Sequence, residues 1–338
     1  MAFDPNAAAA PDSGAYGLSV TPEESAVVLL PAPFEATTSY GGGTAAGPAA
    51  ILAASRQVDL FDLEVGKPYE AGIAWLPEPE GLAALNAEAR ALAQPLIAAG
   101  GAGGEDSAQA RARVDALCER MNDAVRSAVA HWTARGKLVG LIGGDHSTAF
   151  GAVAAAAAAT PGLGILHVDA HADLRHAFEG FAFSHASIMD NVLTRLPGVS
   201  RIVQVGIRDL CEEEMSAIRG CHGRVLSHPD LELARVQLSG GSFSDWARDL
   251  ALELPDAVYV SFDIDGLDPS LCPHTGTPVP GGLSFREACR LLAVLAGAGK
   301  RIVGFDLTEV APGPDGDWDA NVGARLLYKL IGWALLSR

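Results

Sequence analysis

Short runs of continuously apolar residues recur along the chain, and segments of helix length separate most of them. The runs lack the strict alternation of a half-exposed strand, so each predicts a strand that is buried on both faces. Strands that alternate with helices are typical of a mostly parallel sheet covered on both sides. We therefore predict an α/β protein, a single domain with three layers (α/β/α) and a mostly parallel central sheet. The predicted strands are residues 26–33, 137–144, 162–169, 200–209, 257–265 and 300–309, and the predicted helices include 145–160, 184–196, 211–220, 242–253 and 284–299.

The first third of the chain is less regular. Residues 1–24 show no hydrophobic period, and we expect an N-terminal arm that lies over the surface. In the stretch 37–52, three consecutive glycines precede a helical pattern with Pro48 near its start. This predicts a loop that shapes the backbone at a helix entry rather than a phosphate cradle. Residues 76–110 are rich in Ala, Gly and Pro and are expected to be irregular, leading into a long helix at 108–135.

Polar, mostly acidic side chains follow five of the predicted strands at the point where each strand ends. Because the carboxyl ends of parallel strands meet at one edge of a sheet, we expect these side chains to lie together. Each has an ordinary explanation alone, since such aspartates often cap helices or form turns. Four or more carboxylates at one buried edge, however, would be costly unless cations neutralised them, which favours a metal site. The residues are Asp145, His146, Asp169, His171, Asp173, Asp209, Asp263, Asp265, Asp268 and Glu309.

The kinds of ligand narrow the choice of metal. Carboxylates with two imidazoles suit Mn²⁺, Fe²⁺, Co²⁺, Ni²⁺ or Zn²⁺, and the absence of cysteine from the group argues against a structural zinc site. The ligands are too many for one ion with an open position. Two ions roughly 3.5–4 Å apart, sharing aspartates and a bridging water, fit their number better.

Four motifs in this order resemble the ureohydrolase superfamily of arginases, agmatinases, guanidinobutyrases and formiminoglutamases. They are GGDHS (143–147), DAHADLR (169–175), SFDIDGLDPS (261–270) and FDLTEVAP (305–312). The resemblance covers residues 25–338 and implies an arginase-like domain there. It also implies two divalent ions per chain, Mn²⁺ first and Ni²⁺ as the alternative, with Asp169 and Asp263 as bridges. The six ligands that it implies are His146, Asp169, His171, Asp173, Asp263 and Asp265.

The resemblance further implies catalytic roles for three residues. Glu309 matches the acid that pairs with the guanidinium or amidine nitrogens of the substrate, and His185 in FSHAS matches a proton-shuttle histidine. Asp173 would relay the proton of the attacking hydroxide to the leaving nitrogen. The implied protein is a metal-dependent amidinohydrolase that releases urea and an amine or ammonia from a guanidino compound.

The substrate itself is less constrained. Agmatine, guanidinobutyrate, guanidine and a small alkylguanidine are candidates, whereas Cys211 stands where arginases carry an acid, which argues against L-arginine. Arg175 either points into the pocket, favouring a carboxylate-bearing substrate, or folds outward. Asp209 and Thr275 are further candidate substrate-binding residues. Three phenylalanines either wall the pocket or pack their loop: Phe178, Phe181 and Phe183.

Two alternatives to a guanidino hydrolase stay open. A formimino substrate would yield formamide, and a catalytically silent subunit of a hetero-oligomer would have no substrate. A metal-dependent deacetylase shares a related architecture, but the paired DAHAD and DIDGLD motifs fit it poorly.

Composition narrows the partners and the compartment. The formal charge of −17 disfavours nucleic acid and anionic membranes. We expect no secretory signal, because the start of the chain lacks a basic region followed by an apolar one. We expect no membrane span, because the apolar runs are short. Five cysteines without a CxxC pair are typical of reduced thiols, so we expect a cytoplasmic protein. The resemblance implies a homo-oligomer, either a trimer or a hexamer.

Overall fold

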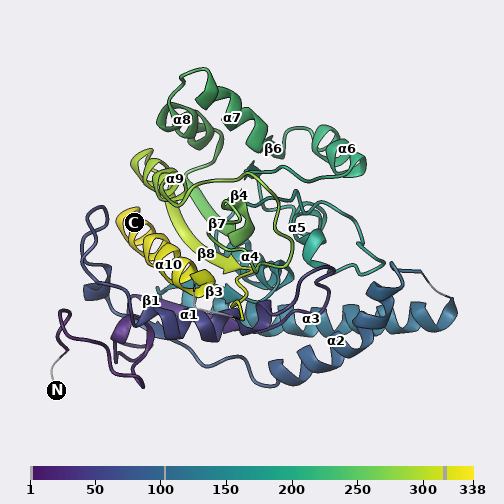
Figure 1. Cartoon of the computed structure of the whole chain (residues 1–338), viewed down its shortest axis with the longest axis horizontal. Helices are drawn as coiled ribbons and strands as arrows, with labels where there is room; N and C mark the ends of the chain where they lie inside the picture. Colours follow the sequence, from purple (N-terminus) through teal and green to yellow (C-terminus); the bar gives the residue numbers. More distant parts are fainter. Residues whose placement is uncertain (1–2, 103, 315–317) are drawn as a thin grey trace.

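A computed structural model describes residues 3–102, 104–314 and 318–338, and its centre is one parallel sheet (Figure 1). The strands are β1 (Val27–Ala32), β2 (Ile73–Trp75), β3 (Leu138–Gly143), β4 (Gly164–Val168), β5 (Arg201–Val205), β6 (Val225–His228), β7 (Ala257–Asp263) and β8 (Arg301–Thr308). Their order across the sheet is β2-β1-β3-β8-β7-β4-β5-β6, and every neighbouring pair is parallel. The sheet therefore has one edge at which all its carboxyl ends meet.

Helices cover both faces of the sheet, which confirms the three-layer α/β/α prediction (Figure 1). They are α1 (Gly47–Ser55), α2 (Leu82–Ala98), α3 (Glu105–Thr133), α4 (Ala149–Ala159), α5 (Ile188–Arg195), α6 (Glu212–Gly220), α7 (Asp230–Leu238), α8 (Phe243–Glu253), α9 (Phe285–Gly297) and α10 (Trp318–Leu336). One apolar cluster joins α1, α8, α9 and α10 to the sheet, and a second joins α2, α3, α4 and α5 to its other face. Among the described residues, none of the helices combines the length and apolarity needed to cross a membrane.

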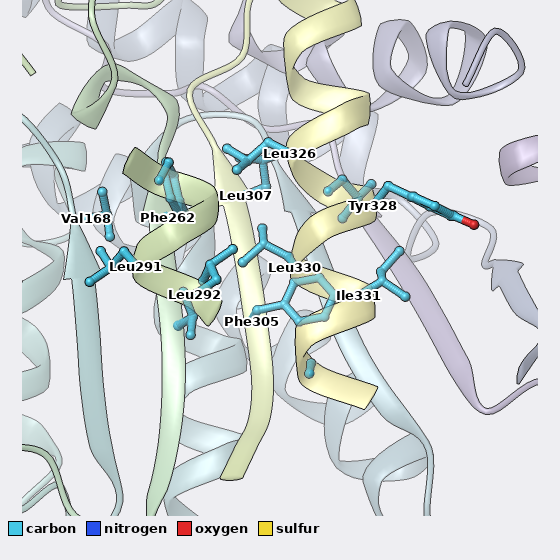
Figure 2. Close-up of a cluster of buried hydrophobic side chains, with 14 of the residues drawn as sticks. Val168, Phe262, Leu291, Leu292, Phe305, Leu307, Leu326, Tyr328, Leu330 and Ile331 are labelled. Carbon is cyan, nitrogen blue, oxygen red and sulfur yellow. The ribbon is translucent and has the colours of Figure 1, made fainter. Parts of the chain in front are cut away.

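Figure 2 shows how tightly the first cluster packs. Leu292 of α9 and Leu330 of α10 lie against Phe262 and Phe305 of the central strands, and all four are at most 2% exposed. Burying a side chain of this size contributes about 1.5–3 kcal/mol each. This core holds β7 and β8 rigidly, so the residues at their carboxyl ends are positioned by packed elements.

All six predicted strands form, and β2 and β6 are additional short strands at the two edges. The expectation that residues 76–110 are irregular is wrong, because α2 occupies Leu82–Ala98. Between Leu82 and Leu96 this helix buries only two alanines, Ala89 and Ala93, so its apolar stripe is faint. Pro95 lies in its last turn, where the pattern predicts a break.

Part of the predicted N-terminal arm packs into the core. The Tyr16 side chain is buried, its hydroxyl donates a 2.9 Å hydrogen bond to the Ala324 carbonyl, and its ring packs against Tyr328. The arm is thus anchored to α10. Its separation from a domain at 25–338 stays a prediction.

An ion-pair cluster at the edge of the sheet predicts a pH-dependent contribution to stability. The His228 Nδ1 lies 3.1 Å from Glu232 Oε1 and its Nε2 lies 2.8 Å from Glu253 Oε2. Burial opposes the charged ring, but the two carboxylates raise the pKa of His228. A raised pKa stabilises the folded state below the unfolded pKa of about 6.5, and this contribution disappears as the pH rises through the folded pKa.

We therefore expect His228→Gln to lower the thermal unfolding temperature more at pH 5.5 than at pH 8.5. The loss at the lower pH should be about 1 kcal/mol or less, because the cluster is partly exposed. Differential scanning calorimetry of both proteins in chelator measures it. An equal loss at the two pH values would contradict the assignment.

Candidate metal centre

Four neighbouring strands deliver polar side chains to the same point. His146 follows β3, Asp169 follows β4, Asp263 ends β7 and Glu309 follows β8. The order β3-β8-β7-β4 makes these strands adjacent although they are far apart in sequence. All four side chains are buried. The prediction that the strand ends bring these residues together is confirmed.

The predicted ligands form two groups that share Asp169. On one side, His146 Nδ1 lies 3.1 Å from Asp169 Oδ2 and 2.9 Å from Asp173 Oδ2. On the other side, His171 Nδ1 lies 3.4 Å from Asp169 Oδ1 and 3.1 Å from Asp265 Oδ2. One oxygen of Asp169 therefore belongs to each group, which is the arrangement that a carboxylate bridging two ions requires.

Asp263 lies beside His146 of the first group and is hydrogen-bonded to Asp265 of the second. Its Oδ2 lies 3.5 Å from His146 Nδ1, and its Oδ1 accepts a hydrogen bond from the backbone N–H of Asp265. Asp265 Oδ1 in turn accepts from the backbone N–H of Ala170. These bonds tie the loop after β7 to the loop after β4, so the two halves of the centre hold each other.

His146 is prepared to act as a ligand through Nδ1. Its Nε2 lies 3.0 Å from Ser261 Oγ, and the Ser261 hydroxyl donates to Asp306 Oδ1 at 3.1 Å. Because the Ser261 proton goes to Asp306, the Ser261 oxygen accepts from Nε2–H, and in the neutral ring Nδ1 is the unprotonated nitrogen. Nδ1 is buried and has no hydrogen-bond partner among the described residues. A buried lone pair without a donor fits a metal ion.

The electrostatics of the centre also call for cations. Burial, together with the charge of Asp169, raises the pKa of Asp173 to about 7, and burial beside Asp265 and Asp169 raises the pKa of Asp263. Burial opposes a charged His171, yet Asp265 and Asp169 raise its pKa to about 12. Carboxylates this close repel one another, so positive charge must lie among them. The site can hold two divalent ions on the six predicted ligands.

Two residues of the site have a backbone conformation that residues other than glycine rarely adopt. Asp173 has φ = 53° and Glu309 has φ = 62°, both in the left-handed region. Such conformations cost of order 1–3 kcal/mol for a residue other than glycine and persist where the surroundings impose them. The Glu309 N–H donates to Gly144, and the Asp173 carbonyl accepts from Met189 and Asp190. The chain therefore bends to aim both carboxylates into the site.

A cavity of about 160 Å³ opens onto the centre. Glu309 lines it and is held by one oxygen only: Oε1 accepts from the His146 N–H at 2.9 Å, whereas the buried Oε2 has no partner among the described residues. Burial, with Asp145 nearby, raises the pKa of this carboxyl well above its usual range. A free, buried carboxylate oxygen beside a metal centre is suited to a cationic N–H donor. The cavity is lined by Ser39, His146, His171, Asp173, Arg175, Phe178, His185, Ala186, Asp209, Glu214, Asp263, Thr277 and Glu309.

Two loops meet beside Glu309, and one of them contains the predicted substrate-binding residue Thr275. The Gly41 N–H donates to the Gly276 carbonyl at 2.8 Å, and a Cβ on Gly276 would lie 2.9 Å from Glu309 Oε2. Glycine at 276 therefore leaves the space that Glu309 Oε2 faces. Gly43 has φ = 106° immediately before the helical turn Thr44–Ala46, so this glycine shapes the backbone at the helix entry as predicted. The N–H groups of Gly43 and Ala45 donate to the Glu35 carboxylate.

The other end of the cavity carries charges of both signs. The guanidinium of Arg175 stacks on the Phe178 ring at 4.7 Å, and its Nε lies 3.7 Å from Glu214 Oε2. The side chain of Arg175 therefore lines the cavity but packs against the cavity wall. It has features of both predicted orientations, into the pocket and folded away from it. Asp209 also lines it. Thr275 is buried and is not among the lining residues, whereas Thr277 is, so the role of Thr275 stays a prediction.

The remaining predicted residues divide between the cavity and the core. His185 lines the cavity, its N–H donates to Thr37 Oγ1, and burial with nearby His171 lowers the pKa of its ring to about 3. Phe181 and Phe183 are buried in the core, so they pack the loop. Asp145 and Asp268 have the ordinary functions: Asp145 Oδ1 caps the next turn through the Ser147 N–H, and Asp268 Oδ1 accepts from Ser270.

Four buried residues around the ligands were missed. Ser261 and Asp306 support His146, and His167 with Gln204 lies beside Asp169. A signal was present: each is a polar residue inside an apolar run that predicts a buried strand. Polar groups at such positions need partners, and here the partners lead to the metal ligands.

Comparison with known proteins agrees with this geometry. Residues 25–332 match the model of a protein family described as the arginase family. The chain is 34% identical to N(1)-aminopropylagmatine ureohydrolase of Thermus thermophilus over 94% of this chain and 93% of that protein. It is 29% identical to agmatinase of Bacillus anthracis over 92% and 93% of the two chains. The crystal structure of agmatine ureohydrolase of Thermoplasma volcanium superposes with a TM-score of 0.73 at 28% identity, covering 94% of this chain and 92% of that one.

Proposed function

The chain belongs to the arginase family, and we propose that it uses two divalent metal ions to hydrolyse a guanidino compound of the agmatine type, releasing urea and an amine. One observation carries this proposal. Asp169 presents one oxygen to each of two ligand groups, and the free oxygen of Glu309 faces the cavity above them. The names of the relatives, which include agmatinase and aminopropylagmatine ureohydrolase, favour agmatine and its N-substituted derivatives over a formimino substrate.

The metal pair fits the residues that would hold it. His146, Asp173 and Asp263 would hold one ion, His171 and Asp265 the other, and Asp169 both, with Asp263 as the second bridge. When bound, such a pair lowers the pKa of a shared water and supplies hydroxide near neutral pH. We propose Mn²⁺ as the resident metal and Ni²⁺ as its competitor. Since all six ligands lie together, a catalytically silent subunit is not favoured.

The residues of the chain then perform the remaining steps. Glu309 Oε2 accepts hydrogen bonds from the guanidinium and fixes its carbon over the centre. Asp173, which borders the cavity, takes the proton of the attacking hydroxide and gives it to the leaving nitrogen. His185, neutral in its buried position, exchanges protons between the cavity and solvent. Glu214 and Asp209 carry two negative charges against the one positive charge of Arg175 at the other end of the cavity. That part of the cavity, which would hold the tail of the substrate, is therefore acidic enough for an amine.

Urea release by the purified protein tests the function. Metal-free protein is loaded with Mn²⁺ or Ni²⁺ and given agmatine, N(1)-aminopropylagmatine, L-arginine, 4-guanidinobutyrate, guanidine or methylguanidine. Formiminoglutamate is scored by formamide. We expect the highest kcat/KM with one of the two agmatine compounds. Preference for 4-guanidinobutyrate would instead show that Arg175 binds a substrate carboxylate, and release of formamide alone would overturn the proposal.

We also propose that the protein is a cytoplasmic homo-oligomer, a trimer or a hexamer. All five of its cysteines are unpaired, which is typical of a reducing compartment. Light scattering of the purified chain would give the number of subunits.

We expect His185→Asn to lower kcat about 100-fold, the usual contribution of a positioned proton-transfer group, while two metals stay bound. His176→Asn is the matched control, because His176 is in the same loop but its side chain is 91% exposed and pairs with Asp190. Steady-state kinetics and metal analysis of both variants provide the measurement. A fall in metal content in His185→Asn would place this histidine among the ligands instead.

A further inference from the structure

A buried histidine that belongs to neither catalysis nor the predicted ligand set touches the metal centre. His167 on β4 and Gln204 on β5 are partners in the strand register, and both are fully buried. His167 Nε2 lies 2.8 Å from Asp169 Oδ2, and His167 Nδ1 lies 3.1 Å from Gln204 Nε2. By proximity alone His167 is a candidate ligand, because its ring lies within the same group of ligand atoms as His146, Asp169 and Asp173.

The orientation of the Gln204 amide decides what His167 can do. Gln204 Nε2 lies 2.7 Å from the carbonyl oxygen of Ala172. A carbonyl oxygen only accepts, so the amide nitrogen, and not the amide oxygen, must face it. The amide nitrogen has two hydrogens. With one directed at Ala172, the other is directed at His167 Nδ1.

The proton of His167 is fixed as a consequence. Because Nδ1 accepts from Gln204, the single proton of a neutral imidazole lies on Nε2. A doubly protonated ring would set Nδ1–H against the N–H of Gln204, with no acceptor between them. Nε2–H therefore donates to Asp169 Oδ2, and a nitrogen that carries a proton cannot bind a metal ion.

We propose that His167 is a positioning residue, held by Gln204 in its Nε2–H tautomer, which orients the bridging carboxylate of Asp169 and stays outside the metal coordination. The inference rests on the metal centre of the proposed function. His146 has the same tautomer but faces the centre with its other nitrogen, since its Nε2–H is bound by Ser261 and its Nδ1 is free to ligate. Two buried imidazoles 5.3 Å apart thus turn different nitrogens toward the centre, the protonated Nε2 of His167 and the unprotonated Nδ1 of His146.

This arrangement explains how Asp169 can bridge. Its Oδ2 accepts from His167 Nε2–H, and its Oδ1 accepts from the His171 N–H at 2.6 Å. Each carboxylate oxygen has about two lone-pair directions, so one remains on each oxygen for an ion. With both oxygens fixed by N–H donors, the carboxylate cannot rotate toward one ion and leave the other.

Variants that separate a hydrogen-bond donor from a ligand test the proposal. Glutamine at position 167 keeps an N–H near the place of Nε2 but has no imidazole, whereas leucine has neither. We expect His167→Gln to bind Mn²⁺ within about threefold of the parent and His167→Leu to bind it about 10–100-fold more weakly, the usual effect of losing such a support. Gln204→Leu removes the amide that keeps the proton of His167 on Nε2, and it should weaken Mn²⁺ binding about tenfold. Asn122→Leu is the control, because it removes another buried amide, on α3.

Calorimetric titration of the metal-free proteins with Mn²⁺ gives affinity and stoichiometry, and thermal unfolding in chelator checks that each variant is folded. Equal, large losses in His167→Gln and His167→Leu would overturn the proposal by making the ring itself a ligand. Unchanged affinity in His167→Leu or Gln204→Leu would overturn it by removing the positioning role. If the affinities follow the expected order but no substrate is hydrolysed, the proposed function fails while this inference stands.

Discussion

Replacing Asp169 by asparagine is expected to reduce the bound metal from two ions per chain to one or none and to lower kcat/KM by at least about 1,000-fold. A metal ion contributes several kcal/mol to a transition state, and about 1.4 kcal/mol is tenfold in rate. The amide would still fill the space. Its NH₂ group, however, cannot ligate and must face one of two N–H donors, His167 Nε2 or the His171 backbone.

Asp268→Asn is the matched control for this substitution. Asp268 also follows a strand of the site, but it accepts from Ser270 in a turn. We expect two metals and unchanged kinetics in this variant. Metal analysis after dialysis, together with urea release, distinguishes the two variants. Two tightly bound ions in Asp169→Asn would mean that Asp169 is not the shared ligand.

The fold was largely predictable because its strands are continuous apolar runs. β3, β4, β7 and β8 are buried on both faces, and no other element explains such runs well. The two strands that were missed are short edge strands, and β2 has only three residues, fewer than a hydrophobic period can reveal. α2 was missed for a related reason, since alanines carry little of the apolar signal that marks a helix face.

The ligand set was predictable because desolvation restricts what a sequence can place at a buried strand end. Once Asp169 and Asp263 are both buried, a nearby cation is needed to offset the free energy of desolvating their charges. The supporting residues depend on pairing across the sheet instead. Gln204 meets His167 only because β5 lies beside β4 in a particular register, and the chain order alone does not contain that information. The side chain of Arg175 posed the same difficulty, because its stacking on Phe178 depends on how one loop folds back.

The second large effect is expected at Glu309, which approaches the substrate without belonging to the six ligands. In Glu309→Gln, the amide oxygen can still accept from the His146 N–H, as Oε1 does now. The NH₂ group would then take the place of Oε2 and point a donor at the N–H groups of the guanidinium. Two donors facing each other in a buried site replace a charge-assisted bond with an unsatisfied contact.

Removing one member of a buried, hydrogen-bonded charge pair costs about 2–5 kcal/mol. We therefore expect kcat/KM of Glu309→Gln to fall about 30- to 4,000-fold, with two metals still bound. Glu309→Asp keeps the charge but withdraws it by one methylene, so it should recover part of the loss, and Glu213→Gln on the exposed start of α6 should change nothing. Steady-state kinetics with the preferred guanidino substrate and metal analysis measure all three. If Glu309→Gln keeps full activity, the carboxylate does not bind the guanidinium; if it loses metal, Glu309 supports the centre rather than the substrate.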